Sequence, residues 1–75
     1  MDEQRRRFRA CFADVVDSDE FDWSTKLNDI EGWQSLTSVD FMVRAFDEFG
    51  VELHSTDFDG LETVEDLYAM TMSKD

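Results

Sequence analysis

The chain has 75 residues and a formal net charge of −12, from 19 acidic and 7 basic side chains. We expect a single domain over residues 1–75, whose thin core leaves no room for the deep pocket of most enzymes. The acidic surface repels phosphate backbones and anionic lipids. It therefore excludes nucleic acid and membrane as partners and favours basic patches on other proteins.

The remaining composition indicates a folded, cytoplasmic protein that we expect to be free-standing and monomeric. Hydrophobic residues make up 41% of the chain and are periodic, which argues against disorder. The lone cysteine, Cys11, allows no internal disulfide. No apolar run reaches the length of a membrane span, and no apolar stretch follows the N-terminal arginines as it would in a signal peptide.

Residues 3–16 are predicted to form the first helix, because five apolar residues recur at helical spacing and share one face. Cys11 belongs to that face, where a buried thiol is inert. The basic residues of this segment are interpreted as a solvated face that offsets part of the acidic surface, with a docking patch as the alternative. The apolar residues are Phe8, Cys11, Phe12, Val15 and Val16, and the basic residues are Arg5, Arg6, Arg7 and Arg9.

Residues 17–34 read as a long polar connection with a short helical turn inside it, and loops of this length usually serve a purpose. Its start resembles a calcium loop, but Asp22 and Asn28 stand where glycine and glutamate are needed, so we predict no metal site. The apolar residues expected to anchor it are Phe21, Trp23, Leu27, Ile30 and Trp33.

Residues 35–49 are predicted to form the second helix, ended by Gly50. Its apolar arc covers about 200°, twice what a helix needs to face a core. Either the helix packs on two sides, or part of the arc is exposed to partners or cargo.

Residues 51–62 are a second connection, with a helical turn near Ser55 to Phe58, and residues 63–71 are predicted to form the last helix. Thr63 and Asp66 have the spacing of a capping box at its start. His54 is expected to face solvent and, with only one cysteine elsewhere, completes no zinc pattern. The prediction is therefore an all-α four-helix bundle, with three longer helices and one short one.

The second helix and its flanks carry a resemblance to a known family. Gly32-Trp33-Gln34-Ser35-Leu36, followed at the expected distance by Glu48-Phe49-Gly50-Val51-Glu52-Leu53, resembles the Asp-Ser-Leu motif and exit of acyl carrier proteins. The stretch Leu61 to Leu67 is similar to the start of that family's last helix. The resemblance covers nearly the whole chain in length, helix order and acidity.

This resemblance implies that the protein is not an enzyme and that Ser35 carries 4'-phosphopantetheine derived from coenzyme A. The arm's thiol would hold acyl or aminoacyl groups as thioesters for fatty-acid, polyketide or related specialised biosynthesis. A helix N-terminus suits an attached phosphate. The alternative is that Ser35 is only an N-cap.

The resemblance also implies partners: a phosphopantetheinyl transferase, and acyl-loading and acyl-processing enzymes with basic docking patches. These would meet one side of the second helix, while Phe41, Ala45 and Phe49 on the other side belong to the core. The predicted partner-binding residues are Gln34, Leu36, Val39, Asp40, Val43, Phe46, Asp47 and Glu48.

Two positions depart from the family pattern. Gln34 stands where most acyl carriers have Asp, which removes a charge that aids recognition by the modifying enzyme. Phe46 stands where many members have an acid, which makes the face more apolar and selective. Gln34 keeps a second hypothesis open, an unmodified carrier-like adaptor that binds partners through its acidic second helix.

Overall fold

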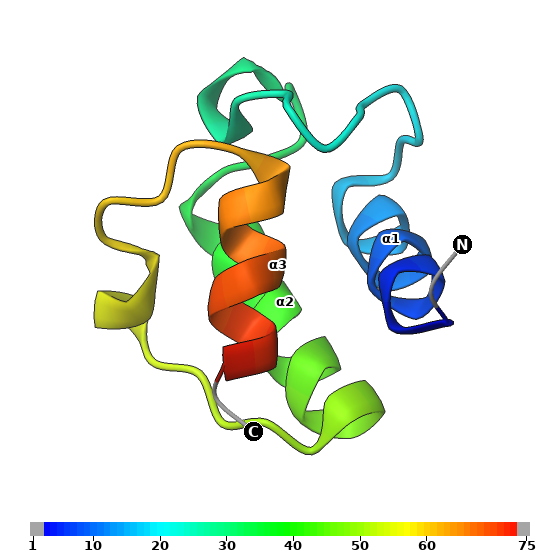
Figure 1. Ribbon diagram of the computed structural model, residues 1–75. Coiled ribbons are helices and arrows are strands. Elements are labelled where there is room, and N and C mark those ends of the chain that lie inside the picture. The colour runs from blue at the N-terminus through cyan, green and yellow to red at the C-terminus, as the bar shows by residue number, and fades with distance from the viewer. Residues whose placement is uncertain (1–2, 74–75) are drawn as a thin grey trace.

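The computed structural model describes residues 3–73, which contain three α-helices and no strand (Figure 1). The helices are α1 (Glu3–Val16), α2 (Ser35–Phe49) and α3 (Val64–Ser73). Two 3₁₀ turns, η1 (Leu27–Asp29) and η2 (Ser55–Phe58), lie in the connections. The all-α prediction is confirmed. The fourth, short helix of the predicted bundle is a single 3₁₀ turn at η2, so three α-helices build the described part of the chain.

The helix ends follow local chemistry. Gly50 takes a left-handed conformation, φ 69°, and its N–H donates to the Phe46 carbonyl at 3.0 Å, which ends α2. Thr63 and Asp66 form the predicted reciprocal box: each backbone N–H donates to the other's side-chain oxygen at 3.2 Å. Thr63 therefore caps α3 instead of opening it, and the helix runs two residues beyond the predicted end at 71.

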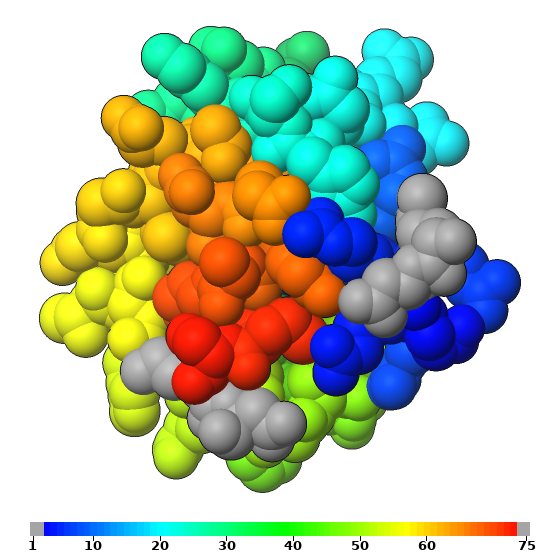
Figure 2. Space-filling view, in the orientation of Figure 1, coloured from blue at the N-terminus to red at the C-terminus, as the bar shows by residue number. Residues whose placement is uncertain are grey.

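Aromatic rings from all three helices meet in the core, beside aliphatic side chains such as Val64 and Leu67. Phe8 and Phe12 of α1 are fully buried, as the periodicity predicts, and both contact the fully buried Phe41 of α2 at ring-centre distances of 5.6 and 6.2 Å. Phe8 also meets Tyr68 of α3 edge to face at 5.2 Å. Aromatic pairs in these geometries stabilise beyond the area they bury. Figure 2 shows α3 at the centre of one face, between α1 and the segment that contains η2.

The connection 17–34 crosses the end of the bundle where α3 begins (Figure 1). Its carbonyls at Trp23 and Thr25 accept the N–H groups of Glu65 and Val64, at 2.9 and 3.0 Å. These are donors that the first turn of a helix cannot satisfy by itself. Its five predicted anchors are buried or half-buried. The connection is therefore an ordered cap on the bundle.

The arginines of α1 do more than form the solvated face that the sequence analysis favours. Arg5 makes a bidentate pair with Glu65 of α3, 3.0 Å for both bonds, and its guanidinium lies over the Tyr68 ring at 4.5 Å. Arg9 donates to the Phe21 and Asp19 carbonyls at 3.1 Å. The prediction of a purely solvated face is wrong because Arg5 and Glu65 are 60 positions apart, and helical spacing cannot reveal a pair so distant in sequence.

No helix within residues 3–73 has both the length and the apolar character needed to cross a bilayer.

Candidate functional site

Ser35 is the first residue of α2, and its side chain is exposed. The N-cap position belongs to Gln34, which has an extended backbone (φ −137°, ψ 178°) and makes no side-chain capping bond. Among residues 3–73, nothing forms a hydrogen bond with the Ser35 hydroxyl. The interpretation of Ser35 as an N-cap is therefore wrong. Within residues 3–73, its side-chain oxygen stabilises no other part of the structure by a hydrogen bond.

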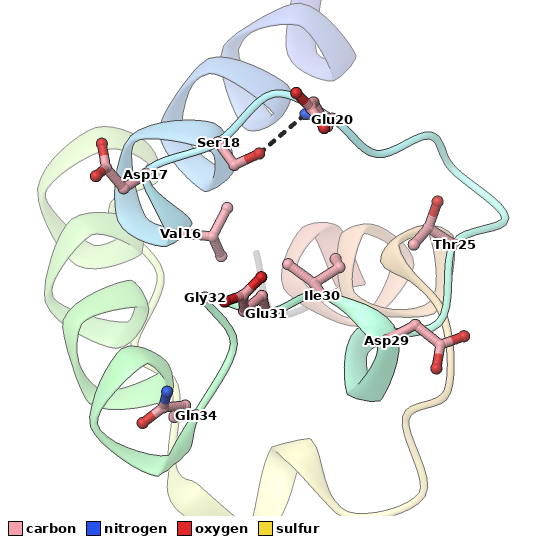
Figure 3. Close-up of a pocket in the computed structure, with 10 residues that line it drawn as sticks. All are labelled: Val16, Asp17, Ser18, Glu20, Thr25, Asp29, Ile30, Glu31, Gly32 and Gln34. Carbon is pink, nitrogen blue, oxygen red and sulfur yellow. Dashed lines mark hydrogen bonds between the residues drawn. The ribbon is translucent and has the colours of Figure 1, made fainter.

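The backbone before Ser35 is held from two sides. Gly32 lies against the end of α1, where a Cβ would collide with the Val16 carbonyl, and Figure 3 shows these two residues side by side. The Gly32 carbonyl accepts the Thr37 hydroxyl at 2.7 Å, which ties the connection to the first turn of α2. The Trp33 ring packs on Phe12 at 5.5 Å. The backbone that leads into the exposed Ser35 is therefore held in a fixed position.

The first turn of α2 has backbone N–H groups that no carbonyl of the helix accepts. The Ser38 N–H donates to the Gln34 carbonyl at 3.1 Å, so the amides of Ser35, Leu36 and Thr37 precede the first intrahelical bond. No acidic residue lies in that turn, which leaves the positive end of the helix dipole uncompensated. A phosphate on the Ser35 oxygen would be stabilised there, so the residues fit a covalently attached phosphopantetheine.

Two shallow hollows flank this end of α2, and Gln34 lines both. One, of about 340 Å³, lies beside Ser35 and is lined by Asn28, Trp33, Gln34, Ser35, Ser38 and Phe58. The other, of about 560 Å³, lies between the end of α1 and the connection 17–34 (Figure 3). Asn28 and Phe58 come from the two 3₁₀ segments, and the sequence analysis did not identify them as site residues.

The outer face of α2 carries an apolar stripe of Leu36, Val39, Val43 and Phe46. Their exposed fractions are 80%, 50%, 64% and 63%. Their spacing of three, four and three residues places them in one line along the helix. The wide apolar arc is thus divided as predicted: Phe41 and Ala45 are fully buried and Phe49 is half-buried on the opposite side.

The three predicted acidic residues of α2 have different surroundings. Asp40 and Asp47 are exposed beside the stripe. Glu48 instead turns toward α1, where Arg7 approaches its carboxylate at 3.6 Å and donates to its backbone carbonyl at 2.7 Å. Arg44 pairs with Asp14 of α1. The structure therefore groups Asp40 and Asp47 with the stripe and assigns Glu48 to the contact between helices.

The other candidate groups do not assemble into a centre. Cys11 is buried against α2, and burial raises the pKa of its thiol from 9.0 to about 11, which makes it a poor nucleophile. His54 is exposed, and its backbone N–H donates to Asp57 Oδ2 at 2.8 Å. Within the described chain, no group of three or more His, Cys, Asp or Glu side chains is placed to hold a metal ion.

Comparison with models of known protein families gives a match over most of the chain. A family model described as the phosphopantetheine attachment site matches residues 6–71, a range that includes all of α2 and most of α1 and α3. No curated protein and no solved structure matches the chain.

Proposed function

The chain belongs to the phosphopantetheine attachment site family, and on that premise we propose that Ser35 is its attachment residue. Members of this family are non-catalytic carriers, so the protein is a carrier and not an enzyme, and its cofactor is covalent 4'-phosphopantetheine. When attached, the group supplies a flexible thiol that holds acyl groups as thioesters. The exposed Ser35 hydroxyl at the positive end of α2, with no internal partner in residues 3–73, is the observation that carries the assignment.

The chain's own residues would serve the arm by position alone. The amides of the first turn of α2 and the helix dipole would favour the attached phosphate. Gly32 and Trp33 would hold the serine at a fixed place while the arm moves. No side chain near Ser35 needs to activate it, because the modifying enzyme supplies that chemistry.

Carrier domains of this kind interact with phosphopantetheinyl transferases and acyl-processing enzymes. We propose that these partners dock on the stripe, with Gln34 beside Ser35, with Asp40 and Asp47 as charged contacts, and with Glu48 at the edge. An apolar stripe with exposed carboxylates along one side matches a partner that has an apolar strip beside basic residues. Phe46 extends the stripe by a further turn and would favour partners that have a matching apolar contact.

The finer proposal is that residues 1–75 act as one monomeric cytoplasmic carrier domain. It would present acyl or aminoacyl groups in fatty-acid, polyketide or related specialised biosynthesis. A second candidate function, an unmodified adaptor, draws support from Gln34 in place of Asp and from a docking stripe that needs no arm to bind.

Intact mass tests the attachment. The purified protein is incubated with coenzyme A, magnesium and a broad-range phosphopantetheinyl transferase, in parallel with Ser35→Ala and Ser38→Ala. Ser38 is the matched control, because it is the other serine in the first turn of α2. We expect one phosphopantetheine on the parent chain and on Ser38→Ala, and none on Ser35→Ala. No gain with several transferases would favour the adaptor instead.

A further inference from the structure

The interior next to Ser35 is closed by aromatic rings. Trp33 is half-buried under the start of α2, with ring-centre distances of 5.5 Å to Phe12, 6.4 Å to Phe41 and 6.0 Å to Phe58. Phe12 and Phe41 are fully buried behind it. Trp33 and Phe58 also line the hollow beside Ser35, so they separate that hollow from the core.

The rings continue without interruption through the molecule. Phe8 contacts Phe12 at 6.0 Å and Phe41 at 5.6 Å, and on its far side meets Trp23 at 5.8 Å and Tyr68 at 5.2 Å. Protein interiors are packed as densely as organic crystals, and extra methylene groups force side chains out of their preferred rotamers. An aliphatic chain could enter here only by displacing these rings.

The hollow beside Ser35 offers a long chain little shelter. Three of its lining residues, Asn28, Gln34 and Ser38, are polar, and together with Ser35 they outnumber the two aromatic walls. Methylene groups lying in such an open, polar hollow would remain largely in water and gain little from burial. Hydroxyl, amide or amino groups would find hydrogen-bond partners there.

We propose that this carrier bears short or polar acyl groups, of the hydroxyacyl or aminoacyl kind, which stay outside the core. It does not shelter long aliphatic chains. The inference rests on the proposed function, because it takes Ser35 as the attachment residue. It narrows the cargo class that attachment alone leaves open.

The test compares a short and a long chain on the same protein. Acetyl- and octanoyl-phosphopantetheine are loaded onto Ser35 from the corresponding acyl-coenzyme A, loading is verified by intact mass, and thermal unfolding is followed by circular dichroism. We expect the two Tm values to agree within about 2 °C. Burial of the six additional methylene groups would raise Tm by more than about 10 °C, and that result would overturn the proposal.

Two tryptophans of similar burial provide a matched control. Trp33→Ala connects the hollow to the core, and we expect octanoyl then to raise Tm relative to acetyl. Trp23→Ala removes a ring at the Tyr68 end of the stack and should leave the two loaded forms equal. Phe58→Ala opens the same wall as Trp33→Ala with a smaller packing loss. If neither Trp33→Ala nor Phe58→Ala gains a chain-dependent Tm, the rings do not close the core and the inference is wrong.

Failure of the proposed function gives a different signal, since no mass gain would appear on any form. The closed core from which the cargo class is argued is then tested by itself on Ser35→Cys alkylated with N-ethyl or N-octyl iodoacetamide, where burial protects Cys11. Equal Tm values support the closed core, and a Tm more than about 10 °C higher with the octyl chain overturns it.

Discussion

The two apolar faces of α2 have the same chemistry and opposite surroundings. On one, Phe41 and Ala45 are fully buried; on the other, Leu36, Val39, Val43 and Phe46 are at least half exposed. The inner face is covered by the rings of α1, whereas no described element covers the outer one. Large exposed apolar residues in a line mark an interaction surface more often than an accident of composition. The comparison shows that hydrophobicity groups residues on a face, while neighbouring elements decide which face is core.

Removing one phenylalanine from each face of α2 is the strongest test of the difference between them. Phe41→Ala should lower the free energy of unfolding by about 3–5 kcal/mol, because it empties a site enclosed by rings. Phe46→Ala should change it by less than about 0.5 kcal/mol, because its side chain is mostly in water. Urea denaturation of both variants measures the difference. Equal losses would mean that the outer face is also buried in solution.

Thiol reactivity compares a group buried against α2 with one at its exposed end. At pH 8, Cys11 should react with iodoacetamide about a hundredfold more slowly than an ordinary thiol, because its pKa is about 11 instead of 9.0. A cysteine introduced by Ser35→Cys should react at least at the ordinary rate, because the N-terminus of α2 favours the thiolate. Peptide mass mapping over time measures both rates, and similar rates at the two positions would contradict the placement of Cys11.

The same thiol gives a pH dependence of stability. Between about pH 9 and 11 the folded chain keeps the Cys11 proton that the unfolded chain has lost, so stability falls as pH rises through that window. Cys11→Ala should lack this component, and the difference between the two urea titrations isolates it.

Gly32→Ala tests the contact with α1 that holds the backbone before Ser35. Its Cβ would meet the backbone of Val16, which cannot move aside as a flexible side chain can, so we expect a loss of about 1–3 kcal/mol. Glu31→Ala, an exposed neighbour, is the control and should be nearly silent. Unfolding in urea measures both variants. An unchanged free energy of unfolding in Gly32→Ala would show that the contact with α1 does not hold the site.

The smallest expected effect concerns the charges beside the stripe. Asp47→Asn should lower kcat/KM for transferase modification by up to about fivefold at low salt, because an exposed charge contact is worth at most about 1 kcal/mol. The effect should fade in 0.5 M salt. Glu52→Gln, exposed but beyond the end of α2, is the matched control. An equal loss in both variants would point to net charge instead of docking.

Much of the fold could be predicted from periodicity and local chemistry. The bounds of α1 and α2, the Gly50 end and the Thr63–Asp66 box all follow from residues close in sequence. The short helical turn predicted near Ser55 to Phe58 is present, but its four residues close a 3₁₀ turn and not a fourth α-helix. The order of the connection 17–34 also lay beyond sequence reasoning, since it depends on carbonyls that meet α3 some 40 positions later.

The part of the site that depends on residues close in sequence could also be predicted. The exposed half of α2 could be predicted because Leu36, Val39 and Val43 adjoin Asp40 and Asp47 on the helical wheel. Glu48 was grouped with them, but its pairing with Arg7 depends on a residue 41 positions away. Gly32 and Phe58 act through packing between segments, which leaves no local pattern in the sequence.

The arginines of α1 serve the rest of the molecule as an internal counter-ion. Residues 10–75 contain 17 acids and 3 bases, a net charge of −14, and Arg5 and Arg7 contact this acidic body directly. Salt screens charges beyond a Debye length of about 8–10 Å more than it screens contacts of 3–4 Å. Added salt should therefore relieve repulsion across the fold while leaving these pairs largely intact. It should also weaken attraction to a basic partner, so ionic strength moves folding and docking in opposite directions.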